Sequence, residues 1–160
     1  MKFRKAEFQD IDRILEIYSE SREFMRSTGN LYQWAGGYPE REVIEEDIQC
    51  GNFYIAEEEG DIAAIFAMFG GPDETYLIIK DGQWLNSEPY GVIHRIAVAK
   101  KGRGIVSECF KFAFERYGNI RIDTHKDNLP MQKALIKNGF SRCGIIFLKN
   151  GDERIAFQKI

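Results

Sequence analysis

The stretch of residues 90–114 constrains the fold more than any other part of this sequence. It reads YGVIHRIAVA, then KKGRG, and then IVSECFKFAF. The first part is an apolar run without sharp alternation, which is typical of a strand buried on both faces. The second part is a short basic turn with two glycines, and the third repeats apolar residues at helical spacing. The sequence therefore predicts a buried strand that passes through a turn into an amphipathic helix.

The remaining periodicities give an order of elements in which strands and helices alternate. We expect strands at residues 2–6, 53–57, 62–69, 92–99, 120–124, 140–148 and 154–158. Helices are expected at 11–25, at 40–49, after the KKGRG turn as far as Gly118, and from near Pro130 to Asn138. Residues 73–89 fit either a short helix or an extra strand. The helix at 40–49 carries an acidic run that we interpret as a solvated outer face, made of Glu42, Glu45, Glu46 and Asp47.

This order predicts an α/β (α+β) fold. A strand–helix–strand unit in the second half requires a parallel pair, whereas the hairpins require antiparallel pairs. The expected result is a mixed, mostly antiparallel sheet of about seven strands, with about four helices distributed over both faces. The length of 160 residues favours a single domain over 1–160.

Charge and composition favour a cytoplasmic protein. The formal net charge of -3 argues against a nucleic-acid partner, which requires a basic face. No apolar run approaches the ~20 residues that span a bilayer, and no secretory signal is recognisable, so we expect no membrane partner. The cysteines Cys50, Cys109 and Cys143 form no CxxC motif, and with only two histidines in the chain we predict reduced thiols and no metal site.

The basic turn has the chemistry of a phosphate site. Gly102 and Gly104 allow a ligand to approach the backbone, and the first N–H groups of the following helix have no partner within the helix. Lys100, Lys101 and Arg103 add positive charge. A pyrophosphate would suit this turn, although the pattern matches neither a P-loop nor a dinucleotide-binding turn. A basic loop with ordinary turn glycines is the alternative.

Several segments together resemble the GNAT superfamily of N-acetyltransferases. Its signature is a strand ending in Val, the motif [QR]-x-x-G-x-[GA] before a helix, a later helix with an Asn, and a closing Gly-Phe. Here KGRGIV at 101–106 occupies the motif, Asn128 the Asn, and Gly139-Phe140 the closing pair. Lys101 and Val106 depart from the usual residues at their positions. The resemblance covers essentially the whole chain and implies acetyl-CoA as co-substrate, with no metal.

The resemblance also implies which residues contact the cofactor. Backbone groups of the strand 96–98 would pair with the pantetheine arm, N–H groups of the turn would hold the pyrophosphate, and the side chain of Asn128 would contact the arm. A helix N-cap is the alternative role of Asn128, and one residue could serve both. The full set of expected cofactor residues is Ile96, Ala97, Val98, Lys101, Gly102, Arg103, Gly104, Ile105, Val106, Asn128, Met131 and Leu135.

The expected reaction is direct attack of an amine on the thioester, without a covalent enzyme intermediate. Many members carry a Tyr four residues before the Gly of Gly-Phe as general acid, whereas this chain has Leu135 there. An alkylamine is almost fully protonated at neutral pH, so a base is useful. His94 is the candidate, because two-residue alternation places it on one face with Ile96 and Val98, and arylalkylamine acetyltransferases of the same superfamily have a His there. A His satisfied in the core is the alternative.

Aromatic residues in irregular segments suggest an acceptor pocket for a small-molecule or peptide amine. The expected substrate-binding residues are Tyr32, Trp34, Tyr38, Trp84, Tyr90 and His125. For those in residues 27–40, a clamp of the loop onto the core is an equal alternative, and His125 fits an ordinary loop position as well. Arg95 and Asp123 are expected to form a structural pair if they interact. A CoA-binding module without turnover is the rival function, a nucleotide-binding protein is a third, and a homodimer is left open.

Overall fold

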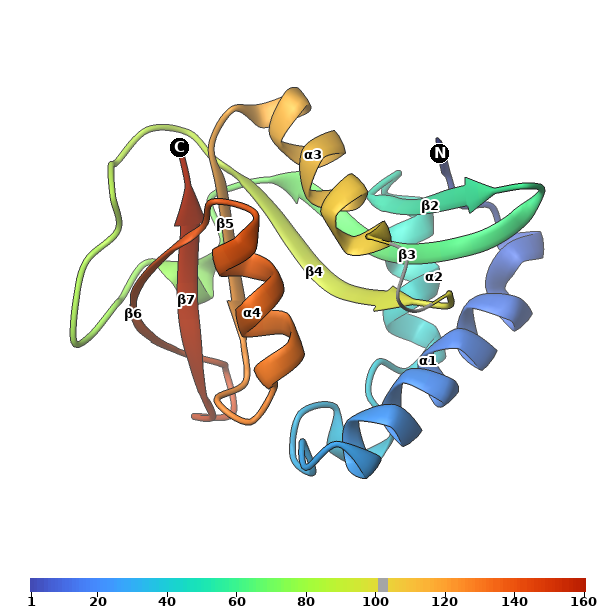
Figure 1. Cartoon of the computed structure of the whole chain (residues 1–160), viewed down its shortest axis with the longest axis horizontal. Helices are drawn as coiled ribbons and strands as arrows, with labels where there is room; N and C mark the ends of the chain where they lie inside the picture. The colour runs from blue at the N-terminus through green and yellow to red at the C-terminus, as the bar shows by residue number, and fades with distance from the viewer. Residues whose placement is uncertain (101–103) are drawn as a thin grey trace. The chain divides into compact units, whose positions relative to one another are not determined.

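The computed structural model describes residues 1–100 and 104–160, and it confirms the expected order of strands and helices (Figure 1). The strands are β1 (Lys2–Lys5), β2 (Phe53–Glu58), β3 (Asp61–Gly70), β4 (Gly91–Val98), β5 (Ile120–Thr124), β6 (Ser141–Phe147) and β7 (Glu153–Lys159). The helices are α1 (Ile11–Ser27), α2 (Arg41–Gln49), α3 (Ile105–Tyr117) and α4 (Leu129–Lys137). Short 3-10 turns lie at Phe8–Asp10, Ala35–Gly37 and Glu74–Tyr76.

The strands form one mixed sheet in the order β1-β2-β3-β4-β5-β7-β6. β1, β2 and β3 pair antiparallel, as do β5, β7 and β6, whereas β4 pairs parallel with β5 through Gly91 and Ile120 and through Val92 and Arg121. The predicted fold class is therefore confirmed. In the described part of the chain, no helix has the length and apolar character needed to cross a membrane.

The contacts of the chain divide it into two compact units. Unit one comprises Met1–Met68 and His94–Cys109, and unit two comprises Phe69–Ile93 and Phe110–Ile160. β4 and α3 each contribute residues to both units. The single domain expected for residues 1–160 stays a prediction.

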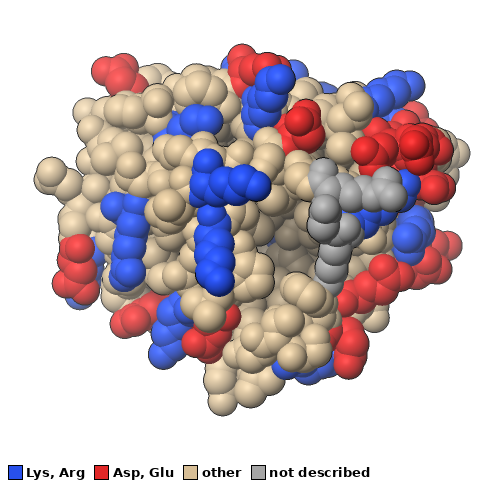
Figure 2. All heavy atoms as spheres, viewed as in Figure 1, with Lys and Arg blue, Asp and Glu red and all other residues tan. Residues whose placement is uncertain are grey.

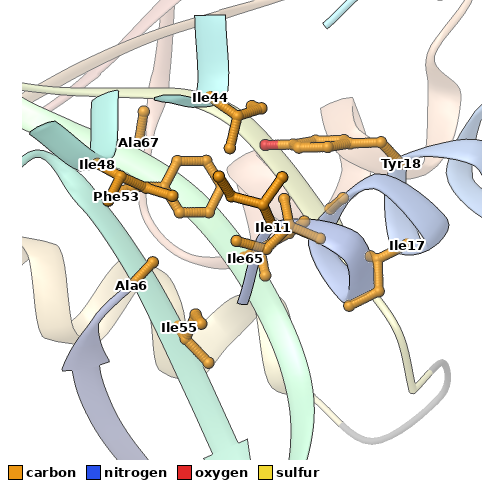
Figure 3. Packing of buried hydrophobic residues seen from close by; sticks show 12 residues of the cluster. Ala6, Ile11, Ile17, Tyr18, Ile44, Ile48, Phe53, Ile55, Ile65 and Ala67 are labelled. Carbon is orange, nitrogen blue, oxygen red and sulfur yellow. The ribbon is translucent and has the colours of Figure 1, made fainter. Parts of the chain in front are cut away.

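Unit one is built around a core between two helices and one face of its strands. Buried apolar residues of α1 and α2 meet those of β2 and β3 in this core (Figure 3). Its members are Ala6, Ile11, Ile14, Ile17, Tyr18, Ile44, Ile48, Phe53, Ile55, Ile65, Ala67 and Ala97. The opposite face of β2 and β3 is also buried, with Tyr54 stacked on Phe66. These strands are therefore apolar on both faces, as continuous apolar runs predict.

Unit two contains β5, β6 and β7 together with α4 and the long segment of residues 70–90. Two-residue alternation along β5 turns Ile120, Ile122 and Thr124 to one face and leaves Arg121 and Asp123 on the other. The segment of residues 70–90 packs on that second face through Tyr76, whose hydroxyl donates to Asp123 at 2.6 Å. It forms neither a full helix nor a named strand, only the turn Glu74–Tyr76 and an isolated bridge between Lys80 and Ile145.

Candidate functional site

β4 contains a backbone irregularity at the centre of the predicted site. Arg95 has a φ of 56°, in the left-handed region that residues other than glycine rarely adopt. Its neighbours His94 and Ile96 are both half-buried. A left-handed residue interrupts the alternation of a strand, so period two cannot place His94 on one face with Ile96 and Val98. The expectation that alternation places His94 on the face of Ile96 and Val98 is therefore wrong in its reasoning. The role of His94 as a base stays a prediction.

The side chain of Arg95 forms an ion pair with Asp47, which was not predicted from the sequence. Its Nη2 lies 2.7 Å from Oδ2 of Asp47, and Nε lies 3.1 Å from the same oxygen. Both side chains are almost buried, with 14% and 13% of their surface exposed. Burial raises the pKa of the Asp47 carboxyl, and the nearby side chains of Arg95 and His94 oppose this effect. His94 therefore lies within electrostatic reach of this buried pair.

Two sequence predictions are wrong at this pair. Asp47 does not belong to a solvated face of α2, because only 13% of its side chain is exposed and its carboxylate pairs with Arg95. Helical spacing indicates that Asp47 lies beside the inward-facing residues, since it follows Ile44 by three residues and Val43 by four. The expected partner of Arg95 was Asp123, whereas its partner is Asp47, and Asp123 accepts a hydrogen bond from Tyr76.

The aromatic residues of the loop 27–40 differ in their surroundings. Trp34 packs edge-on against the buried ring of Tyr18, with ring centroids 5.4 Å apart, which supports the clamp alternative for this residue. Tyr38 accepts a hydrogen bond at its hydroxyl from Nη1 of Arg95 at 3.1 Å and remains exposed. Tyr32 is also largely exposed. Tyr38 therefore contacts the irregular part of β4 at Arg95, and Trp34 packs the loop against α1.

The start of α3 retains the features expected of an anion site. Gly104 has a φ of 67°, and its carbonyl accepts the N–H of Glu108 at 3.2 Å. The N–H groups of Ile105 and Val106 precede this first bond and have no acceptor within the helix. Among the described residues, none lies within 4 Å of a Cβ built on Gly104, and its positive φ is the feature that favours glycine there. The side chain of Ile105 is buried and that of Val106 is half-buried.

Part of the predicted turn lies outside the described residues, namely Lys101, Gly102 and Arg103. The preceding Lys100 is described, and its Nζ lies 3.3 Å from the carbonyl oxygen of Glu58 and 3.5 Å from Oδ2 of Asp61. These contacts join the end of β4 to the turn between β2 and β3. On the face shown in Figure 2, basic and acidic side chains of the described residues are interspersed.

The corner between β5 and α4 holds three further predicted residues. The Asn128 side chain accepts the N–H of Met131 at 3.2 Å, so its N-cap role is confirmed. His125 is buried, and its Nδ1 accepts the N–H of Asp127 at 3.0 Å, which assigns the ring proton to Nε2. Burial lowers the pKa of His125. Leu135 has 0% exposed surface, so its side chain belongs to the core and offers no surface to a cofactor, contrary to expectation.

Trp84 and Tyr90 already enclose a side chain of unit two. The guanidinium carbon of Arg121 lies 4.3 Å and 4.0 Å from their ring centroids. Trp84 donates from Nε1 to the carbonyl of Tyr76 at 2.8 Å, and the Tyr90 hydroxyl accepts the N–H of Asp73 at 3.0 Å. Arg121 is buried and donates to the carbonyl of Asn86. These contacts stabilise the segment of residues 70–90, and the acceptor role of both aromatics stays a prediction.

The described residues offer no good covalent nucleophile among the buried thiols and no group of three or more His, Cys, Asp or Glu side chains arranged to hold a metal. Burial raises the pKa of the Cys109 thiol to about 12 and also raises that of Cys143. Because the thiolate is the reactive form, both are nearly inert at neutral pH. Cys50 is exposed at the end of α2.

Comparison with solved structures relates the whole chain to acetyltransferases. A GNAT-family acetyltransferase from Streptococcus agalactiae 2603 is 35% identical, with a TM-score of 0.91, over 99% of this chain and 94% of that one. A GNAT-family acetyltransferase from Listeria monocytogenes 4b F2365 is 22% identical over 99% and 93% of the two chains, with a TM-score of 0.73. AAC(6')-Ib, solved with ribostamycin and coenzyme A, is 19% identical over 99% and 92%, with a TM-score of 0.66.

The sequence identities of the last two proteins are low enough that they show the fold alone, whereas the 35% identity of the first also relates the sequences. No protein-family model matches the chain, and no curated protein sequence does. The element order, the strand β4 leading to α3, and the 35% identity over nearly the full length agree with one another. The chain belongs to the GNAT family of acetyltransferases.

Proposed function

We propose that this chain transfers an acetyl group from acetyl-CoA directly to a primary amine of a small molecule or peptide. The observation that carries the proposal is the passage from β4 through Gly104 into α3, where N–H groups without an acceptor in the helix follow a strand. Membership of a family of acetyltransferases supports acetyl transfer as the reaction class. Acetyl-CoA would supply the activated acetyl group.

The cofactor would be held mainly by backbone groups. The peptide groups of Ile96 and Val98 would pair with the pantetheine arm in the manner of an added strand. The N–H groups at the start of α3 would face the pyrophosphate, where the partial positive charge of a helix N-terminus favours an anion. No described residue lies within 4 Å of a Cβ built on Gly104, which is compatible with a ligand close to the backbone.

His94 would remove the proton of the attacking amine, directly or through one water. A positioned base of this kind contributes about 10²–10⁴-fold to the rate. The nitrogen forms its bond to the acetyl carbon while the bond from that carbon to sulfur breaks, and the leaving thiolate takes a proton from water or from the amine. His94 lies in electrostatic reach of the carboxylate of Asp47.

No enzyme thiol would carry the acetyl group. The two buried cysteines, Cys109 and Cys143, are poor nucleophiles because burial raises the pKa of their thiols. Initial rates at several concentrations of both substrates would therefore give intersecting lines in a double-reciprocal plot. Parallel lines, or an acetylated protein mass after incubation with acetyl-CoA alone, would contradict direct transfer.

The central experiment follows thiol release from acetyl-CoA with a panel of amines and peptides. We expect turnover with at least one amine, and a loss of about 10²-fold or more in kcat for His94→Ala with an unchanged Kd for CoA. Glu42→Gln, at an exposed position of α2, is the control and should leave kcat and the Kd for CoA unchanged. Tight CoA binding without turnover on any acceptor would instead favour a CoA-binding module.

A further inference from the structure

The left-handed Arg95 is a strained residue in the interior of a strand. Residues other than glycine pay a conformational cost there, and they keep such a conformation only when surrounding contacts impose it. Glycine would adopt the same backbone at little cost. An arginine at this position therefore implies that other side chains hold it in place, and these side chains can be identified.

Two buried groups hold Arg95 from opposite ends. The hydroxyl of Tyr18, from α1, donates to the carbonyl oxygen of Arg95 at 2.6 Å. Tyr18 is itself fully buried and reaches from α1 toward the side of Ile44 (Figure 3). Asp47, from α2, binds the guanidinium through Nε and Nη2. The backbone and the side chain of the same residue are thus each fixed by a different helix of unit one.

We propose that Asp47 and Tyr18 are positioning residues that hold β4 in its irregular conformation at Arg95 and thereby set the orientation of His94 and Ile96. The inference rests on the proposed function, in which His94 is the base and the backbone of Ile96 pairs with the cofactor. Peptide groups on both sides of a residue turn when its φ changes sign, so loss of the left-handed state would misdirect both neighbours at once.

The hydroxyl of Tyr38 adds a third contact, which is exposed. It accepts from Nη1 of Arg95 at 3.1 Å, on the side of the guanidinium that Asp47 does not use. This contact links the loop 27–40 to the same arginine. The buried contacts of Tyr18 and Asp47 are the ones that fix the conformation, since a hydrogen bond open to water is worth less than a buried one.

The test compares two double variants that differ by one methyl group. Asp47→Ala with Arg95→Gly and Asp47→Ala with Arg95→Ala both delete the ion pair, and neither leaves a buried charge without its partner. Only in the alanine version does residue 95 carry a Cβ, which disfavours the left-handed backbone conformation about fivefold to thirtyfold. We expect the glycine version to keep kcat near the wild-type value and the alanine version to lose about fivefold or more.

A matched control is Glu42→Gln, which removes one carboxylate from an exposed position of α2 and should leave kcat unchanged. Tyr18→Phe should lower kcat, and the same change should have a smaller effect in a chain that already carries Arg95→Gly. Equal losses of kcat in the two double variants would overturn the inference, because a direct role of Asp47 in binding or proton transfer is not restored by glycine. Wild-type kcat in both double variants would overturn the inference as well, because the conformation at residue 95 would then not need the two side chains.

Backbone chemical shifts of residues 95 and 96 keep the inference separate from the proposed function. The glycine version should preserve the amide shift of Ile96, whereas the alanine version should move it, whether or not the protein turns over any amine. If the wild-type chain shows no turnover, the proposed function fails and these shifts still decide the inference. Unchanged Ile96 shifts in the alanine version would refute it.

Discussion

Gly91 and Tyr117 offer a quantitative test of the packing that joins β4 to α3. A Cβ built on Gly91 would overlap Cδ2 and Cγ of the Tyr117 ring. These atoms are at the base of the ring, so a small rotation of its far end cannot relieve the overlap. Gly70 provides the matched control, since a Cβ there would lie 3.7 Å from Cε1 of the same ring, an ordinary contact.

The expected magnitudes separate the two glycines clearly. Overpacking of this kind costs about 1–3 kcal/mol of unfolding free energy, while replacing a compatible glycine by alanine gains about 0.4–1 kcal/mol through the unfolded state. Gly70→Ala should therefore be neutral or slightly stabilising, and Gly91→Ala should lower the free energy of unfolding. For a chain of this length, each kcal/mol corresponds to about 2–4 °C in Tm.

Urea and thermal unfolding of Gly91→Ala, Tyr117→Ala and their combination complete the cycle. If the ring is the obstacle, Gly91→Ala should cost little in a chain that already lacks it, which gives a coupling free energy of about 1–3 kcal/mol. A Gly91→Ala protein as stable as Gly70→Ala, or additive losses in the double variant, would refute the close approach of the Tyr117 ring to β4.

Three further predictions concern groups whose environment is fixed by burial. Iodoacetamide at pH 8 should modify the folded chain at Cys50 and spare Cys109, whose thiol has a pKa raised to about 12, as intact mass before and after addition of urea would show. Because the pKa of His125 is lowered on folding, the unfolded chain binds the proton first, so stability should fall as the pH drops below about 6.5. This part of the loss should be absent in His125→Asn, and identical pH profiles for the two proteins would contradict it. Tyr76→Phe removes the donor to Asp123 and should lower Tm by roughly 3–12 °C, a charge-assisted bond being worth about 1.5–3 kcal/mol; an unchanged Tm would mean that the bond is not formed.

The fold could be predicted from the sequence because its elements are defined by local patterns. Apolar periodicity and turn residues gave all the strands and helices of the described chain to within a few residues. Residues 73–89 could not be assigned, since their structure depends on distant groups: Tyr76 binds Asp123, and Trp84 packs on Arg121. A segment held by such contacts has no periodicity of its own for a sequence analysis to detect.

The candidate site was predictable only in part. The N-cap at Asn128 follows from a residue type with a local role, and it is confirmed. The positive φ of Arg95 has no local signal, because arginine does not favour this conformation and the groups that impose it come from α1 and α2. The inward position of Asp47 was available from helical spacing and was obscured by the acidic residues around it.

Two arginines, Arg121 and Arg95, divide the predicted acceptor residues into two groups. Arg121 is held between Trp84 and Tyr90, so an acceptor would have to displace a buried guanidinium to reach those ring faces. Arg95 is neutralised by Asp47 and donates to the hydroxyl of Tyr38, a residue that remains exposed. Displacing a buried charge from two aromatic rings costs far more than covering an exposed ring. The proposed recognition of an amine is therefore better sought in the loop 27–40, where Tyr38 contacts Arg95, than among the aromatic residues of unit two.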